Sequence, residues 1–185
     1  QTYIQRNGDQ YEYLTDEEKD VEQEIKNTEV ESSGVADELE KIVFDFVIKQ
    51  RKIRYDAGSS QNQGQDYSYS RKLDDRLHGR EYELSINVIS PFHEHTDNEQ
   101  MLRTASTYKA DELFVLMPSD ERLVRDLLMF KRTEKYIKQN ISVTQQEAVK
   151  RILNDKGFQN REREARLRQQ VQTLSLIHIS EPTRL

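Results

Sequence analysis

The chain has 185 residues, of which 34% are hydrophobic and 34% are charged, and its formal net charge is −6 at pH 7. It contains no cysteine, which excludes disulfide bonds and thiol catalysis and fits a cytoplasmic protein. No apolar run approaches the roughly 20 residues that a membrane-spanning helix needs, so no membrane contact is expected.

The charge is distributed unevenly along the chain. Residues 1–45 contain fourteen acidic and four basic residues, whereas the remainder has a net charge of +4. An acidic surface repels nucleic acid, while a basic one attracts nucleic acid or an acidic protein surface. A polyanionic partner is therefore expected to meet the part of the chain after residue 45.

The first elements are predicted to be a β-hairpin and two helices. Strands over Thr2–Arg6 and Gln10–Leu14 flank Asn7-Gly8-Asp9, and Asn-Gly is typical of a type I′ turn. A capping box predicts a surface helix over Thr15–Asn27. A second helix is expected over Gly34–Gln50, with one buried stripe formed by Val35, Leu39, Ile42, Val43 and Phe46.

The middle of the chain is predicted to form strands. Lys52–Tyr55 and Tyr67–Leu73 lie on either side of the polar loop Asp56–Asp66. Glu112–Pro118 is a continuous apolar run, which is typical of a strand buried on both faces. The clearest alternating strand is Tyr82–Ile89, whose inward face is predicted to consist of Leu84, Ile86 and Val88.

The last third of the chain is predicted to be helical. Ser119-Asp120 caps a long helix that extends to about Asn140. Capping-box spacings that begin at Ser142 and Thr144 predict the next helix, which Gly157 interrupts. A very polar helical stretch then ends at about residue 173.

Together these elements predict an α+β fold with an N-terminal hairpin and two helices, a small sheet and long C-terminal helices. We expect an α+β module over residues 1–91, which is also compatible with a winged helix. A strand and long helix continue the core over 92–140, after an irregular stretch with one helical turn around Gln100–Thr104. A polar helical extension follows over 141–173, and 174–185 form a separate tail.

The sequence contains no nucleotide-binding loop. A Walker A loop requires two glycines five residues apart, followed by Lys and Ser or Thr. The closest pair, Gly58 and Gly64, is six residues apart and is followed by Gln65. "IVFDF", Ile42–Phe46, resembles a Walker B strand, but the helical periodicity of its neighbours favours a core helix with Asp45 on its surface.

Two polar clusters resemble functional sites. His93-Glu94-His95 resembles metal ligands, but zinc requires three or four ligands, which favours a solvated loop. Arg71–Glu81 contains Asp74 and Asp75 beside three arginines and could act as a phosphate sensor or an intersubunit arginine site. A surface salt-bridge cluster at a turn made by His78-Gly79 is favoured instead. We assign no catalytic, cofactor-binding or metal-ligating residue to this chain.

Nucleic-acid binding has one candidate surface in the sequence. In a winged helix, the helix over residues 34–50 would enter the groove, but its outer face is acidic and phosphates repel it. The C-terminal helices are more basic and would lie along phosphates, or form a solvated face or a helix–helix interface. Their basic residues are Lys150, Arg151, Lys156, Arg161, Arg163, Arg166 and Arg168.

Three stretches carry a resemblance to a known family: "YEYLTDEEKDVEQEI" (Tyr11–Ile25), "RKLDDRLHGREYELSINVISPF" (Arg71–Phe92) and "LLMFKRTEKYIKQN" (Leu127–Asn140). They are similar to the large P-loop ATPase of BREX (bacteriophage exclusion) systems, the BrxC family, over residues 1 to about 173. The resemblance implies a cytoplasmic phage-defence protein that self-associates and works with a methyltransferase and other BREX subunits. ATP and magnesium are implied for the parent protein, but its Walker motifs match nothing here.

The ends of the chain suggest a fragment. The chain begins with Gln1 instead of methionine, which fits a piece from downstream of the P-loop. "LSLIHISEPTR", Leu174–Arg184, resembles the translation of a transposase-based sequencing adapter, so Leu174–Leu185 are expected to have no structural or functional role.

Two functions follow as hypotheses. The first is an interaction and coupling module of a BREX ATPase, which transmits nucleotide-driven changes to partner subunits or to complexes on DNA. The alternative is a winged-helix-like DNA-binding module that uses the basic C-terminal helices. An independent enzyme is disfavoured, because no acid–base or metal constellation stands out.

Overall fold

The computed structural model describes residues 4–7, 10–13, 15–55, 64–96 and 98–179, and their side chains over 15–55, 64–96 and 98–174. Gly8 and Asp9 of the predicted turn, 56–63 of the predicted loop and 180–185 of the predicted tail lie outside the described residues. The chain divides into two compact units: unit 1 is Gln1–Val35 with Arg125–Leu167, and unit 2 is Ala36–Val124 with Arg168–Leu185. The fold is α+β, as predicted.

Unit 1 begins with the predicted hairpin and capped helix. Strand β1 (Ile4–Asn7) pairs antiparallel with β2 (Gln10–Tyr13). Helix α1 (Asp16–Asn27) follows, and its capping box is confirmed. The Thr15 hydroxyl accepts a hydrogen bond from the Glu18 amide at 3.3 Å, and the Glu18 carboxylate accepts one from the Thr15 amide at 2.7 Å.

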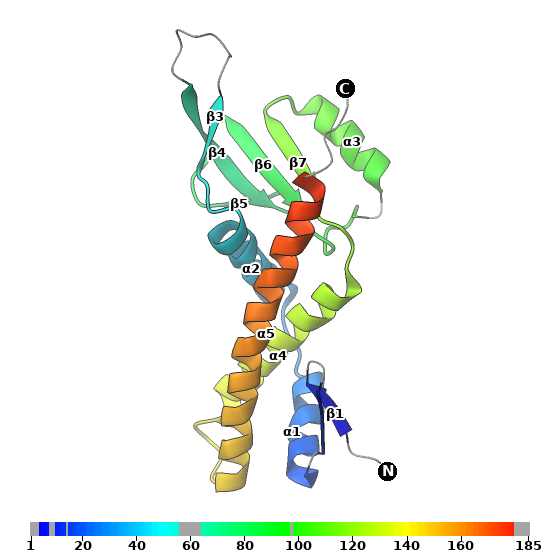
Figure 1. Ribbon diagram of the computed structural model, residues 1–185, viewed down its shortest axis with the longest axis vertical. Helices are drawn as coiled ribbons and strands as arrows, with labels where there is room; N and C mark the ends of the chain where they lie inside the picture. The colour runs from blue at the N-terminus through cyan, green and yellow to red at the C-terminus, as the bar shows by residue number, and fades with distance from the viewer. Residues whose placement is uncertain (1–3, 8–9, 14, 56–63, 97, 180–185) are drawn as a thin grey trace. The chain divides into compact units, whose positions relative to one another are not determined.

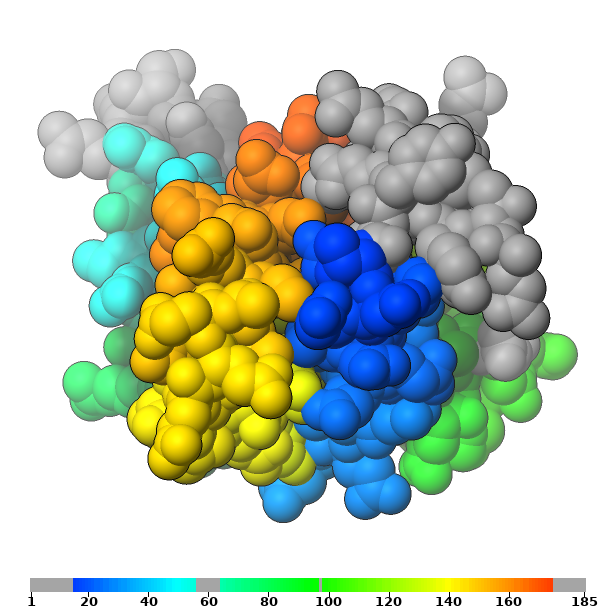
Figure 2. All heavy atoms as spheres, turned by 90° about the horizontal axis from the view of Figure 1, so that it is seen from below, coloured from blue at the N-terminus to red at the C-terminus, as the bar shows by residue number. Residues whose placement is uncertain are grey.

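The core of unit 1 joins α1 to α4 (Glu121–Asn140) and α5 (Glu147–Ile179). The two apolar residues of α1 are buried there, with exposed fractions of 5% and 1%. Figure 2 shows α1 in blue beside the yellow and orange residues of α4 and α5. The cluster consists of Val21, Ile25, Tyr136, Ile152 and Leu153.

Helix α5 differs from its prediction in three respects. Its predicted end at about residue 173 is wrong, because the helix continues to Ile179. The interruption predicted at Gly157 is wrong, because α5 continues through it. Glycine lowers helix stability by only about 1 kcal/mol relative to alanine, and the buried neighbours Lys156 and Asn160 anchor the helix on both sides of it. The capping boxes predicted at Ser142 and Thr144 do not form, since 141–143 make a turn and the helix begins only after residue 146.

In unit 2 the second predicted helix changes its winding. Helix α2 (Ser32–Lys41) starts in unit 1 and continues as a π-helix, η1 (Ile42–Val47), in which the Ile48 amide bonds to the Val43 carbonyl five residues earlier. The wider turn buries Phe44, which is 1% exposed, and leaves Phe46 partly exposed. The prediction that Phe46 faces inward is therefore wrong, whereas Asp45 is exposed as predicted.

The sheet of unit 2 is mixed. Its described strands are β3 (Lys52–Tyr55), β4 (Gln65–Leu73), β5 (Arg76–His78), β6 (Leu84–Ile89) and β7 (Glu112–Leu116). Four of them follow the order β3-β4-β6-β7, and β5 pairs with β4 (Figure 1). Strands β4, β6 and β7 are parallel, while β3 and β5 run antiparallel to β4.

Two of the strands are buried differently from their predictions. Strand β7 ends the described strand order and contacts α3 (Glu99–Tyr108), which is longer than the single predicted turn. Leu113 of β7 is 58% exposed, so burial on both faces is wrong for an edge strand. In β6, Leu84 is 39% exposed, whereas Asn87 on the opposite face from it is fully buried. Simple alternation fails because both faces of β6 are covered at its carboxyl end.

Candidate functional site

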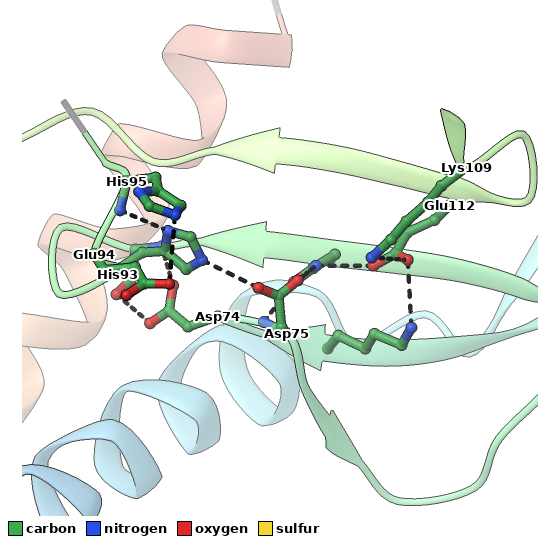
Figure 3. Close-up of polar contacts among 10 residues, drawn as sticks. Asp74, Asp75, His93, Glu94, His95, Lys109 and Glu112 are labelled. Carbon is green, nitrogen blue, oxygen red and sulfur yellow. Dashed lines mark hydrogen bonds and ion pairs between the residues drawn. The ribbon is translucent and has the colours of Figure 1, made fainter. Parts of the chain in front are cut away.

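A tight turn lies at the carboxyl end of the parallel strands. Asp74 and Asp75 alone connect β4 to β5, and their φ angles are +48° and +65°. Positive φ at both central residues defines a type I′ turn, and aspartate is one of the few side chains that tolerate it. Because β4 and β6 are parallel, residues that follow β6 meet this turn, as Figure 3 shows for Asp75 and His93.

Asp74 anchors the turn to the end of β6. Its carboxylate accepts hydrogen bonds from the Ser90 amide at 2.7 Å and the Ser90 hydroxyl at 2.6 Å. Its own amide donates to the Val88 carbonyl at 2.9 Å. Ser90 is fully buried, so these donors fix the turn and occupy the carboxylate.

Asp75 belongs to a second set of contacts, centred on the buried Asn87 side chain. The Asn87 amide donates to Asp75 at 2.7 Å and to Glu112 at 2.8 Å, and its oxygen accepts from the Asp75 amide at 3.2 Å. Glu112, whose side chain is 5% exposed, pairs with Lys109 at 3.1 Å and Lys72 at 3.4 Å. We call the following residues the sheet network: Asp74, Asp75, Asn87, Ser90, His93 and Glu112. The buried side-chain amide of Asn87 donates both of its N–H groups within this network.

His93 completes the sheet network. Its Nδ1 accepts a hydrogen bond from the His95 amide at 3.1 Å, so in the neutral ring Nε2 carries the proton and donates to Asp75 at 3.1 Å. The His93 side chain is only 8% exposed, so the prediction of a solvated loop is wrong for this residue, because Asp75 holds it against the turn. Within the described ranges, no three His, Asp or Glu side chains are grouped so that they could hold a metal ion.

We expect the sheet network to make stability depend on acid pH through Asp75. Burial alone would raise the pKa of Asp75, but hydrogen bonds from His93 and Asn87 and nearby positive charge hold it below its ordinary value. A carboxyl with a lowered folded pKa contributes stability above its unfolded pKa of about 3.9, and that stability is lost as the pH falls through the folded pKa. Asp75→Asn should therefore flatten the loss of stability below about pH 4.

Urea unfolding at a series of pH values measures this effect. Glu94→Gln is the matched control, because the Glu94 side chain is 80% exposed. Equal acid profiles for Asp75→Asn and the unmodified chain would contradict the assignment.

A second polar cluster ties β5 to α2. Arg76 bonds to Asp37 at 2.6 Å and to Glu40 at 3.0 Å, and His78 pairs with Glu40. The carboxylates of Asp37 and Glu40 raise the pKa of Arg76. The predicted salt-bridge cluster is confirmed for Arg76, although its acidic partners come from α2. Asp74 and Asp75 instead contact the sheet network.

Gly79 closes the turn after His78, as predicted. Its φ of +85° lies in the region that favours glycine. The His78 ring stacks on Phe44 at 5.6 Å between centroids, and the Arg71 guanidinium lies 5.6 Å from the Phe44 centroid. This arrangement packs the cluster against η1 and is structural in character.

Several basic residues of α5 are used inside the units. In unit 1, Lys156 forms a buried ion pair with Glu22 at 2.7 Å. Also in unit 1, Arg163 donates to the Asn160 oxygen at 2.6 Å, and burial followed by the charge of Arg166 lowers its pKa. In unit 2, the Arg168 guanidinium lies 3.6 Å from the Phe46 ring centroid. These contacts leave fewer free cations on α5 than the sequence indicated.

The sequence analysis did not predict that Asn87 and Glu112 belong to the site, although each is a polar residue in or beside an apolar run. Asn87 interrupts an apolar strand in "INVI", and Glu112 opens the apolar run "ELFVL". A polar side chain in a buried strand requires hydrogen-bond partners, which indicates a network. What the sequence could not provide was the register that aligns these strands.

The comparisons with known proteins agree with the resemblance found in the sequence. Residues 28–176, more than half of the chain, match the family described as BREX ATP-binding protein BrxC 4th domain with six-stranded beta sheet. No solved structure matches the chain. Across the part of the chain that the structure describes, no helix has the length and apolar character needed to cross a membrane. The chain therefore belongs to the BrxC family of BREX ATP-binding proteins, which it matches through that family's fourth domain.

Proposed function

We propose that this chain is an interaction and coupling module of a BREX phage-defence ATPase. It transmits nucleotide-driven changes that arise elsewhere in the parent protein to other BREX subunits. ATP and magnesium belong to the parent, since this chain lacks a Walker A loop. The cytoplasm is the proposed location, and self-association of the parent is part of the proposal.

One observation carries the proposal: the chain passes between its two units inside helices. The boundaries at residues 35/36, 124/125 and 167/168 fall within α2, α4 and α5. A continuous helix transmits a displacement along its axis, whereas a flexible loop absorbs it. The polar side chains of unit 2 are consistent with this role. Asp74, Asn87 and Glu112 hydrogen-bond to other residues of unit 2 and so serve to hold the fold together.

The test interrupts one helix in the complete BREX ATP-binding protein. Two glycines inserted after Val124 break α4 at the unit boundary, and two glycines inserted after Ser142, in the turn before α5, are the matched control. We expect the α4 insertion to retain ATP hydrolysis but abolish protection against phage plating, while the control retains both. Full protection with the α4 insertion would refute coupling through this helix.

A second measurement addresses the location of the nucleotide site. We expect the 185-residue chain by itself to hydrolyse no ATP. Turnover that depends on this chain alone would overturn the assignment of nucleotide chemistry to the rest of the parent.

The alternative, DNA binding by the basic face of α5, has less support. Lys156, Arg163 and Arg168 take part in contacts within their own units. The remaining exposed cations, such as Arg151 and Arg161, are spread along the helix. Gel-shift analysis with charge reversal at Arg161, Arg163, Arg166 and Arg168 tests this alternative.

A further inference from the structure

One edge of the unit 2 sheet concentrates positive charge. Lys49, Arg51, Lys52 and Arg54 fall within six positions, and all four are exposed. Within the described residues, no ion pair engages any of them. Strand β3 pairs with β4 along one side and ends the strand order, so its other side is open in the described sheet (Figure 1).

Aromatic and apolar side chains accompany these cations. Alternation along β3 places Lys52 and Arg54 on one face of the sheet and Ile53 and Tyr55 on the other. Tyr67 of β4 lies directly opposite Ile53 in the strand register. Ile53, Tyr55 and Tyr67 are 43%, 62% and 38% exposed, so two tyrosine rings are accessible on the face opposite Lys52 and Arg54.

Gly64 leaves room for the Arg54 side chain. A Cβ atom built on Gly64 would lie 2.8 Å from Arg54 Nε and 3.3 Å from its Cγ. The absence of a side chain at Gly64 therefore allows the Arg54 side chain to lie close to the backbone at the residue before β4.

Protection of a sheet edge does not explain this composition. Edge strands often carry lysine or other charges that prevent pairing with another chain. A protective edge, however, would not also expose Ile53, Tyr55 and Tyr67, which favour association. The combination of cations and accessible rings instead matches surfaces that bind unpaired nucleotides.

We propose that the β3 edge, defined as Lys49, Arg51, Lys52, Arg54, Tyr55 and Tyr67, binds single-stranded nucleic acid. A single strand that lies along the open edge of β3 reaches both faces of the sheet. Its phosphates contact the four cations, and its bases stack on the two tyrosines. Unstacked bases expose the ring faces that tyrosine needs, which favours a single strand over a duplex. An acidic peptide would use the cations but has no aromatic base for the rings. This site is independent of the proposed coupling role and of the basic face of α5.

The experiment measures binding of a fluorescein-labelled oligothymidylate to the full 185-residue chain by fluorescence anisotropy over a salt series. Removing two phosphate contacts with the double variant Lys52→Glu and Arg54→Glu should weaken binding and reduce the salt slope by about 1.4, at about 0.7 per contact. Tyr55→Ala should weaken binding by about fivefold to 150-fold, the usual range for one stacked base, while Tyr55→Phe retains it.

The matched control reverses two exposed charges on α5, with Arg151→Glu and Arg161→Glu, and should bind as the unmodified chain does. Circular dichroism confirms that each variant is folded. No anisotropy change at low salt, or equal losses for the β3 and α5 variants, would overturn the proposal. Displacement by polyglutamate as effective as by unlabelled oligonucleotide, together with no effect of Tyr55→Ala, would identify an acidic protein partner instead and would also overturn it.

Discussion

Replacing Lys156 with methionine should lower the free energy of unfolding of unit 1 by about 3–5 kcal/mol. Lys156 and Glu22 have side chains that are 7% and 11% exposed, and their charged atoms lie 2.7 Å apart. Loss of the ammonium leaves the Glu22 carboxylate in the interior without this partner, and a buried unpaired charge is strongly destabilising. Urea unfolding followed by far-ultraviolet circular dichroism measures the change.

Two controls separate charge burial from loss of packing. The double variant Lys156→Met with Glu22→Leu should recover most of the lost stability, since apolar residues often replace a buried ion pair without net loss. Lys150→Met removes an exposed pair with Glu147, whose atoms lie 2.8 Å apart, and should change stability by less than about 1 kcal/mol. Similar losses of stability for Lys150→Met and Lys156→Met would show that burial does not determine how much an ion pair contributes to the free energy of unfolding.

Phe44→Ala is expected to destabilise unit 2 by about 3–5 kcal/mol, the usual range for truncating a buried phenylalanine. Phe44 is 1% exposed, stacks on His78 and lies beneath Arg71. Phe46→Ala should have a smaller effect, because Phe46 is partly exposed and its ring packs against the Arg168 guanidinium. A contact of this kind contributes about 0.5–2 kcal/mol.

Thermal unfolding of the two alanine variants compares them directly. They differ only in which of two neighbouring rings is truncated, so each serves as the other's control. A larger loss for Phe46→Ala would indicate that Ile42–Val47 winds as an ordinary α-helix, as the spacing of its apolar residues predicted, and would contradict the π-helix.

Local signals predicted the elements whose determinants lie within a few residues. The capping box at Thr15 and the cap at Asp120 form as predicted, because each depends on side chains that bond to the next turn of their own helix. The β1–β2 hairpin likewise follows from its short connecting sequence. The type and order of most elements were therefore accessible without tertiary information, although β5 was not predicted and α3 was predicted only as a single turn.

Features that depend on distant residues were not accessible. The π-helical winding of η1 places Phe44 in the core instead of Phe46. The spacing of apolar residues in the sequence follows an ordinary α-helix and does not indicate this winding. The burial of Asn87 requires Asp75 and Glu112, which are 12 and 25 residues away and come together only through the strand register. Gly157 misled the prediction because glycine marks helix ends only where packing does not hold the helix.

The two segments of unit 1 are made at very different times during synthesis. Glu22 and Lys156 are 134 residues apart, so a ribosome adding about 5–20 residues per second separates them by roughly 7–27 s. The described strands of the unit 2 sheet lie between Lys52 and Leu116 and emerge within that interval. During this delay Val21 and Ile25 of the nascent chain lack Tyr136, Ile152 and Leu153, so α1 completes its packing only after the start of α5 has been made.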